Sequence, residues 1–283
     1  MSTWTRQVVL VAVPYQIYII TQSSFAVGLL GIVLAIAMVA SGLYGGGLID
    51  RFDRGTIQIA GRALAALTSL LLVANALWSG ALWLVFALSV VGTAGYSISN
   101  SARSASIPRM VDPDLLPAAL AIGQVLQNGG AIIGPALGGV LIAGLGLPWT
   151  YAVDVIAFLP AVVMLRFLSP LPPLHSSNVT RGWRAPAEGL RFVRSSHILI
   201  ATMLADLGAT VFGMPTAIFP ALALSVFHVG PTGLGLLYSA PGVGALVGAL
   251  FSGWVSRVDA QGRLIIWSIA LWGVAIAGFG LLG

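Results

Sequence analysis

A short charged segment reads Gly47-Leu48-Ile49-Asp50-Arg51-Phe52-Asp53-Arg54 and separates two long apolar runs, Phe25 to Gly47 and Thr56 to Trp78. Each run is about as long as a helix needs to be to cross a hydrocarbon layer of roughly 30 Å. Few residues join the two runs, and several of them are charged. The segment therefore predicts two membrane-crossing helices joined by a tight charged turn.

The composition of the whole chain also indicates a membrane protein. Of the 283 residues, 58% are hydrophobic and only 7% are charged, and the mean hydropathy is +0.99. Soluble domains carry roughly 25% charged residues, so a soluble enzyme is excluded. The sequence contains no lysine and no cysteine, which excludes a lysine-containing phosphate loop, a Schiff-base lysine and thiolate metal sites. We therefore expect no nucleotide, no cofactor and no metal.

Reading for apolar runs gives about nine segments of roughly spanning length. They are Gln7 to Ile20, Phe25 to Gly47, Thr56 to Trp78, Ala81 to Ala102, Leu116 to Ala143, Trp149 to Leu168, Ile198 to Leu224, Gly233 to Val255 and Leu264 to Gly283. The first segment would reach only about 21 Å at ~1.5 Å per residue, and Arg6 precedes it, so we interpret it as the back half of a span. The sequence thus predicts an all-α polytopic protein in a lipid bilayer.

The basic residues fix the predicted orientation. All 13 are arginines, and they fall in the N-terminus, in alternate loops or, for Arg62 and Arg166, in helices toward the same side. The opposite loops contain none; these are Thr21 to Ser24, Ser79 to Gly80, Gly144 to Pro148 and Ser225 to Thr232. By the positive-inside rule the N-terminus is cytoplasmic, and the net charge of +5 reflects topology rather than nucleic-acid binding.

A polar stretch, residues 169–197, divides the chain. It would join an N-terminal bundle, residues 1–168 with a truncated first span, to a partial C-terminal bundle of three spans, residues 198–283. We expect a cytoplasmic linker with a surface helix over Ala187 to Val193, and an unstructured linker is the alternative.

A second charged turn repeats features of the first. Gly253-Trp254-Val255-Ser256-Arg257-Val258-Asp259 keeps the glycine, the arginine and the second aspartate in register. Upstream, Gly28-Leu29-Leu30 matches Gly235-Leu236-Leu237. The matches predict two parallel helical repeats, as in one large class of transporters. Chance similarity between glycine-rich helices is the alternative.

Two motifs carry a resemblance to a known family. The first charged turn resembles the loop motif G-x-L-[x]-D-R-x-[DG]-R of the major facilitator superfamily. Gly130-Ala131-Ile132-Ile133-Gly134-Pro135-Ala136-Leu137-Gly138-Gly139 is similar to the pattern G-x-x-x-G-P-x-x-G-G of its drug:proton antiporters. Essentially the whole chain resembles the branch that contains the enterobactin exporter and related multidrug efflux proteins.

The chain departs from that family in two ways. Members have twelve spans, so the resemblance implies that this chain begins within the first span and ends after the ninth. Antiporters also commonly carry a basic residue within span four, whereas Ala81 to Ala102 has none before Arg103. The second departure puts the usual scheme of proton coupling in doubt.

The resemblance implies a gating role for the first charged turn. Its motif residues would form a latch whose partners differ between inward-open and outward-open states, partly on an eleventh span. These residues are Gly47, Asp50, Arg51, Asp53 and Arg54. A solvated surface loop that contributes little energy is the alternative.

The motif in span five places Gly130, Gly134 and Gly138 on one helical face, with Pro135 and Gly139 beside them. Such a face lets another helix approach closely, and the proline should bend the span. Gating and plain packing both stay open.

Polar side chains inside predicted spans are candidates for the transport path. Gln124, Gln127 and Asn128 form a stripe that would line a cavity or hydrogen-bond another helix. Gln16 in the first span would contact either cargo or a neighbouring helix.

Two carboxylates also lie within spans, where an ionisable group costs at least ~2.5 kcal/mol. A carboxylate that gains and loses a proton as access alternates would couple transport to protons. Asp206 in span seven is the first candidate and Asp154 in span six the second, and structural hydrogen bonding is the alternative for both. Pro215 and Pro220 should break the outer half of span seven.

We therefore expect a secondary transporter of the cell (inner) membrane that exports an amphipathic small molecule, a drug or a siderophore, in exchange for protons. The alternative is a truncated, transport-inactive fragment of such a carrier. An intramembrane enzyme would need a nucleophile–base pair or a metal cluster, and neither is visible in the sequence.

Overall fold

The computed structural model describes residues 2–49, 52–78, 80–166, 191, 193–213, 215–253 and 261–281. Within these ranges every regular element is a helix, which confirms the all-α prediction. Among the described residues, 6 helices are long and apolar enough to cross a membrane. One of them, Pro113–Ala161, has 49 residues and is long enough for two crossings.

The first helix begins earlier than the apolar run Gln7 to Ile20 suggests. Helix α1 (Ser2–Thr21) has 20 residues, which corresponds to about 30 Å. Thr5 and Arg6 belong to it and hydrogen-bond to Asp154 and Thr93 of other helices. Hydropathy alone missed the start of this helix because the polar side chains of Thr5 and Arg6 contact other helices.

Three long helices follow: α2 (Ser24–Ile49), α3 (Arg54–Trp78) and α4 (Leu82–Met110). The charged turn lies between α2 and α3, as predicted. Helix α4 continues beyond its predicted end at Ala102, so Arg103 lies inside the helix. Hydropathy alone therefore placed the end of this helix too early, and Arg103 is the first basic residue of α4.

Helices α3 and α4 cross at a pair of glycines. A Cβ on Gly61 would lie 2.5 Å from the carbonyl oxygen of Gly95, and one on Gly95 would lie 2.7 Å from that of Gly61. This close approach lets side chains of the two helices interact directly along their length.

Helix α5 (Leu116–Arg166) contains predicted span five and the described part of predicted span six. A short 3-10 turn, η1 (Pro113–Leu115), precedes it. Gly146 interrupts α5 with φ 82° and ψ 174°, a conformation that glycine adopts without steric cost. The chain therefore turns back at Gly146, within the predicted loop Gly144 to Pro148 between the two spans.

Span seven is broken, as its prolines predicted. Helix α7 (His197–Gly213) ends before Pro215, which caps a 3-10 turn, η2 (Thr216–Ile218). The single turn α8 (Phe219–Ala221) and a π-helical turn, η3 (Leu222–Val226), complete the segment.

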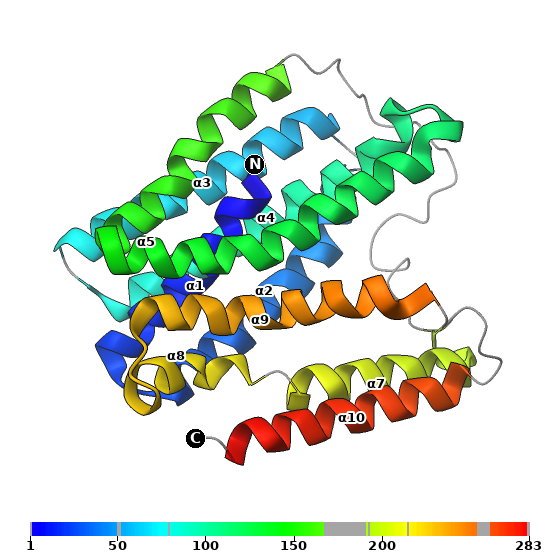
Figure 1. Cartoon of the computed structure of the whole chain (residues 1–283). Coiled ribbons are helices and arrows are strands. Elements are labelled where there is room, and N and C mark those ends of the chain that lie inside the picture. The colour runs from blue at the N-terminus through cyan, green and yellow to red at the C-terminus, as the bar shows by residue number, and fades with distance from the viewer. Residues whose placement is uncertain are drawn as a thin grey trace.

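The last two helices are α9 (Gly230–Phe251) and α10 (Gln261–Leu281). Helix α10 lies beside α7 at the edge of the molecule (Figure 1), and the indole of Trp272 donates a hydrogen bond of 2.7 Å to the carbonyl oxygen of Gly213. The second charged turn and the predicted surface helix in the linker lie largely outside the described residues.

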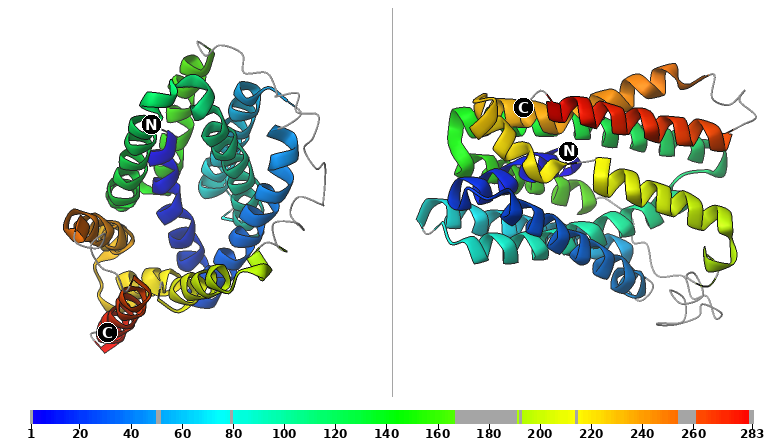
Figure 2. Two further views of the ribbon diagram at one scale, coloured as in Figure 1. Left: turned by 90° about the vertical axis from the view of Figure 1, so that its right-hand side faces the viewer. Right: turned by 90° about the horizontal axis from the view of Figure 1, so that it is seen from below.

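Helix α1 occupies the centre of the molecule. Seen from the side in Figure 2, left, it runs between α5 and the pair formed by α3 and α4. Its buried side chains join those of α4, α5, α8 and α9 in the main apolar core; Val11, Ile17, Val85, Tyr151 and Leu234 are among the most buried. The polar side chains of α1 are thereby held inside the helical bundle.

Candidate functional site

Asp154 is a carboxylate inside the bundle, with only 9% of its surface exposed. The hydroxyl of Thr5 on α1 donates to its Oδ1, and the hydroxyl of Ser69 on α3 donates to its Oδ2, each at 2.7 Å. Two neutral donors from two other helices therefore hold this carboxylate.

Arg6 on α1 supplies a positive charge beside Asp154. Its Nη2 donates a hydrogen bond of 2.7 Å to the hydroxyl of Thr93 on α4. Its guanidinium carbon also lies 5.7 Å from the centre of the Tyr96 ring, within the range of a cation–π interaction. The arginine and the carboxylate are thus oriented by different neutral groups while their charges attract each other.

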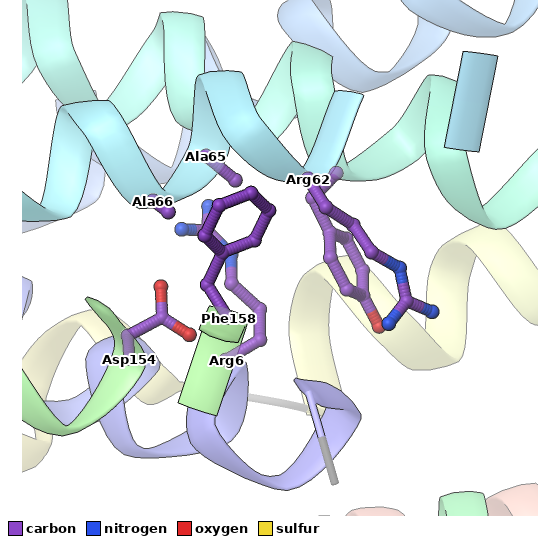
Figure 3. A pocket seen from close by; sticks show the side chains of 7 residues that line it. Arg6, Arg62, Ala65, Ala66, Asp154 and Phe158 are labelled. Carbon is purple, nitrogen blue, oxygen red and sulfur yellow. The ribbon is translucent and has the colours of Figure 1, made fainter. Parts of the chain in front are cut away.

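A pocket lies at this cluster (Figure 3). It has an empty volume of about 330 Å³, part of it open to solvent. We refer to it as the Asp154 pocket; its lining residues are Arg6, Arg62, Ala65, Ala66, Tyr96, Asp154 and Phe158. They come from α1, α3, α4 and the second half of α5, so the pocket belongs to the N-terminal bundle.

The other predicted carboxylate cannot be placed in the same way. Asp206 lies on α7, but its side chain is outside the described residues. Of the two candidate carboxylates, only Asp154 therefore has a side chain whose surroundings belong to the described part of the structure.

The described part of the charged turn packs against its own bundle. Asp53 Oδ1 accepts hydrogen bonds from the backbone N–H of Thr56 at 2.9 Å and from its hydroxyl at 3.3 Å, the geometry of a helix N-cap. Arg54 Nη1 donates to the carbonyl oxygen of Ala105 on α4 at 2.6 Å. Gly47 lies in the last turn of α2, and Asp50 and Arg51 are outside the described residues.

The predicted polar positions differ in accessibility. Gln16 is 2% exposed and accepts a hydrogen bond of 2.7 Å from the Tyr151 hydroxyl. In this conformation it therefore packs against α5 rather than facing a cavity. Gln124, Gln127 and Asn128 are exposed on α5, and Gln124 donates to Asn128 at 3.1 Å.

The glycines of span five contact two different helices. A Cβ on Gly130 would lie 2.8 Å from the Trp4 ring, one on Gly134 would overlap Gln7, and one on Gly138 would lie 3.1 Å from the carbonyl oxygen of Val8. This face therefore packs on α1, which confirms that another helix approaches it closely.

The neighbouring Gly139 instead packs on α9. A Cβ there would lie 2.5 Å from the carbonyl oxygen of Pro231 and 2.9 Å from Cα of Gly235. A Cβ on Gly235 would in turn lie 2.5 Å from the carbonyl oxygen of Pro135. The motif thus joins the first six spans to the segment that follows the linker.

Further contacts between the two parts occur near the loops that contain no arginine. The hydroxyls of Tyr18 on α1 and Ser225 on η3 share a hydrogen bond of 2.8 Å. A Cβ on Gly28, near the start of α2, would lie 3.7 Å from Cβ of Ala217 on η2. We call this region, defined by Tyr18, Gly28, Ala217 and Ser225, the arginine-free contact.

Sequence reasoning missed most of the partners of Asp154. Arg6 looked like a loop residue because it precedes an apolar run, and isolated Thr5, Ser69 and Thr93 gave no signal. The available hint for Arg6 was that the apolar run after it is too short to cross a bilayer unless the helix begins before Arg6. The hydroxyl partners lie far apart in sequence, so only the packing of the helices brings them together.

Comparisons with known proteins agree with this architecture. The family model of the Major Facilitator Superfamily matches residues 1–283. The enterobactin exporter EntS of Citrobacter koseri is 31% identical over 273 residues, which cover 96% of this chain and 65% of that protein. EntS of Salmonella typhi is 30% identical over 261 residues, covering 90% of this chain and 62% of that protein.

A solved structure shows the same fold. The crystal structure of a POT family transporter in complex with a thioalcohol-conjugated peptide matches with a TM-score of 0.61 at 13% identity, covering 92% of this chain and 69% of that one. The chain spans about 62 to 65% of the length of the two exporters. Because the family model matches along the entire sequence, this multi-pass helical chain belongs to the Major Facilitator Superfamily, a family of transporters.

Proposed function

We propose that this protein exports an amphipathic small molecule, of the siderophore or drug type, by alternating access. The similarity to enterobactin exporters extends over 96% of the chain and favours efflux of a siderophore. Cargo would lie between the two helical parts, near the middle of the bilayer, as in related folds.

The observation that carries the proposal is the charged cluster inside the N-terminal bundle. Ionisable groups within membrane-spanning segments are costly and usually belong to substrate or ion pathways. Arg6 and Asp154 line one pocket, while hydroxyls from α1, α3 and α4 complete their hydrogen bonds. A purely structural bundle could use apolar side chains at these positions at lower cost.

Proton coupling is the finer part of the proposal. Asp154 can exist as a carboxylate that accepts two hydroxyl hydrogen bonds or as a neutral acid, because both donors are neutral and can rotate. Protonation would remove its attraction to Arg6 and leave Arg6 held by Thr93 and Tyr96 alone. Asp206, the first candidate from the sequence, stays a candidate for the proton site beside Asp154.

Alternating access would require the arginine-free contact to open and close. With the N-terminus in the cytoplasm, as the arginine distribution predicts, this contact faces outward. The present conformation would then be closed toward the outside. The Gly139 crossing between α5 and α9 offers a tight point about which the two parts could rock.

The test uses proteoliposomes with the 283-residue chain and enterobactin as cargo. We expect enterobactin movement across the proteoliposome membrane to depend on an imposed pH gradient. This dependence should be lost in Asp154→Asn if Asp154 carries the proton, and in Asp206→Asn if Asp206 does. Asp112→Asn, an exposed carboxylate beside the turn η1, is the matched control. Transport that ignores the gradient in the parent would overturn proton coupling, and unchanged coupling in both variants would overturn both assigned carboxylates.

The alternative is that a chain of this length does not transport. This alternative is tested because the chain covers only 62 to 65% of the length of the two enterobactin exporters. Full-length EntS of Citrobacter koseri, reconstituted in parallel, provides the positive control. Active EntS beside an inactive chain would support the alternative, whereas comparable transport by both would exclude it.

A further inference from the structure

Three consecutive residues near the start of α1, Trp4, Thr5 and Arg6, contact three different parts of the N-terminal bundle. The indole N–H of Trp4 donates a hydrogen bond of 2.9 Å to the carbonyl oxygen of Leu126, in span five. The hydroxyl of Thr5 donates to Asp154 in the second half of α5, and the guanidinium of Arg6 donates to a threonine on α4. Successive side chains of a helix point about 100° apart, so the central helix of a bundle can reach three neighbours in one turn.

The indole of Trp4 lies in space that two glycines of span five leave open. A Cβ on Gly130 would lie 2.8 Å from Cδ1 and 3.3 Å from Nε1 of the ring, and a Cβ on Gly129 would lie 3.7 Å from Cζ2. Leu126 is one helical turn before Gly130, so the hydrogen bond and the ring contact involve neighbouring turns of the same helix. We call this contact of Trp4 with Leu126, Gly129 and Gly130 the Trp4 seat.

The backbone of α1 is also close to span five at this level. A Cβ on Gly134 would lie 3.0 Å from the carbonyl oxygen of Trp4 and would overlap the side chain of Gln7. Trp4 and Thr5 belong to the same hydrogen-bonded helix, Ser2–Thr21. Because neighbouring residues of a helix are fixed relative to each other, a shift of α1 at the Trp4 seat also shifts Thr5.

Thr5 supplies one of the two hydroxyl hydrogen bonds to the Asp154 carboxylate. It donates to Oδ1 at 2.7 Å, whereas Ser69, which donates to Oδ2, belongs to α3. Hydrogen bonds weaken steeply when their geometry departs from the optimum. A shift at the Trp4 seat would therefore alter one of these hydrogen bonds while the donor on α3 stays in place.

We propose that Trp4 is a positioning residue for Asp154. Its seat on span five links the antiporter-like glycine motif, through Thr5, to the hydrogen bonding of the carboxylate. The proposal rests on the proposed transport function, in which Asp154 is a candidate for the proton site. Movement of span five during alternating access would then change the surroundings of Asp154, which gives the motif a role in coupling beside its role in helix packing.

Infrared spectroscopy of Asp154 tests this link without requiring transport. The full 283-residue chain is reconstituted in nanodiscs, and the Asp154 band is identified by its loss in Asp154→Asn. We expect two variants to shift the frequency of this band: Trp4→Phe, which removes the indole N–H but keeps an aromatic ring, and Gly130→Ala, which displaces the ring from the side of α5. Thr5→Val removes the donor itself and should cause the largest shift.

Each of these variants has a matched control. Trp83→Phe changes a tryptophan that is 70% exposed near the start of α4. Gly123→Ala adds a Cβ that meets nothing within 4 Å, on the same helix as Gly130. Both controls should leave the Asp154 band at its frequency in the parent. Because Trp4→Phe and Gly130→Ala act on one contact, the double variant should shift the band by less than the sum of the single shifts.

An unmoved Asp154 band in both Trp4→Phe and Gly130→Ala would overturn the proposal, as would an unmoved band in Thr5→Val. Equal shifts in the variants and in their controls would also overturn it. Thermal unfolding shows whether each variant is folded. If Gly130→Ala does not fold, the comparison of Trp4→Phe with Trp83→Phe decides the outcome.

Enterobactin transport in proteoliposomes separates the link from the proposed function. Trp4→Phe should lower the rate driven by a pH gradient about fivefold per folded molecule, the effect of roughly one hydrogen bond, and Trp83→Phe should not. An unchanged rate in Trp4→Phe would reduce Trp4 to a packing role and overturn the proposal. A shifted band in a chain that does not transport would contradict the proposed function and leave the link intact, whereas transport by the parent with an unmoved band in Trp4→Phe would do the reverse.

Discussion

Gly139 on α5 and Gly235 on α9 meet backbone to backbone, so that a Cβ on either residue would lie 2.9 Å from Cα of the other. No side chain separates the two helices at this point. The contact joins a helix of the N-terminal bundle to one that follows the linker. Its closeness depends on both residues being glycine.

Replacing Gly139 by alanine should loosen this crossing. The added methyl group would meet backbone atoms of Pro231 and Gly235, which cannot move aside as a flexible side chain could. Overpacking of this kind costs about 1–3 kcal/mol. Thermal unfolding of Gly139→Ala in detergent should therefore begin at a lower temperature than that of the parent.

Gly123→Ala is the control on the same helix, because a Cβ there would meet nothing within 4 Å. Alanine is the better helix former by roughly 0.5–1 kcal/mol, so this variant should be as stable as the parent or more so. Equal stability of the two variants would show that the crossing is not tightly packed.

Asp154→Leu should destabilise the bundle strongly. The substitution removes the carboxylate oxygens that accept hydrogen bonds from Thr5 and Ser69, and it removes the charge that attracts Arg6. Removing one member of a buried set of charges typically costs about 3–5 kcal/mol. Asp112→Leu at an exposed position should change the free energy of unfolding far less, and a similar loss in both would contradict a special role for Asp154.

Two substitutions of Asp53 distinguish a role as a helix cap from a role as a charged gating latch. Asn can accept the same hydrogen bond from the N–H of Thr56, whereas alanine cannot. Asp53→Ala should therefore cost about 1 kcal/mol of stability, and Asp53→Asn should cost little. If the charge of Asp53 also serves a gating latch, Asp53→Asn should fold normally but transport more slowly. Normal transport by Asp53→Asn would reduce Asp53 to its capping role.

The Tyr151–Gln16 hydrogen bond should contribute modestly to stability. Both side chains are buried, and hydrogen bonds between membrane helices are worth about 0.6 kcal/mol on average and at most roughly 1.7 kcal/mol. A double-mutant cycle with Tyr151→Phe and Gln16→Leu measures their coupling energy. A coupling energy near zero would show that the two groups do not interact in the folded protein.

Much of the helical architecture follows from hydropathy, because lipid-facing helices need apolar side chains over their whole length. The same property explains the errors at Arg6 and Arg103. A polar side chain that faces protein lowers the local hydropathy and resembles the end of a helix, so α1 and α4 are longer than the apolar runs suggest.

The candidate site was harder to predict than the fold. Asp154 stood out as a carboxylate within an apolar run, but its donors Thr5 and Ser69 belong to other helices. Likewise, the spacing of Gly130, Gly134 and Gly138 predicted a close neighbour without identifying α1. Partners of this kind depend on how the helices pack, which one sequence does not reveal.

A pair of introduced cysteines tests whether the two helical parts separate at the arginine-free contact. A Cβ on Gly28 would lie 3.7 Å from Cβ of Ala217, close to the ~3.8 Å typical of a disulfide. The sequence has no cysteine that could compete. Gly45→Cys with Ile98→Cys is the matched control, since Cβ atoms there would lie 4.0 Å apart within the N-terminal bundle.

Enterobactin transport is measured in proteoliposomes after oxidation and again after reduction. Alternating access predicts that oxidised Gly28→Cys/Ala217→Cys stops transporting and recovers on reduction, whereas the oxidised control pair transports throughout. Undiminished transport by the fully cross-linked Gly28→Cys/Ala217→Cys variant would contradict movement of the two parts at this contact.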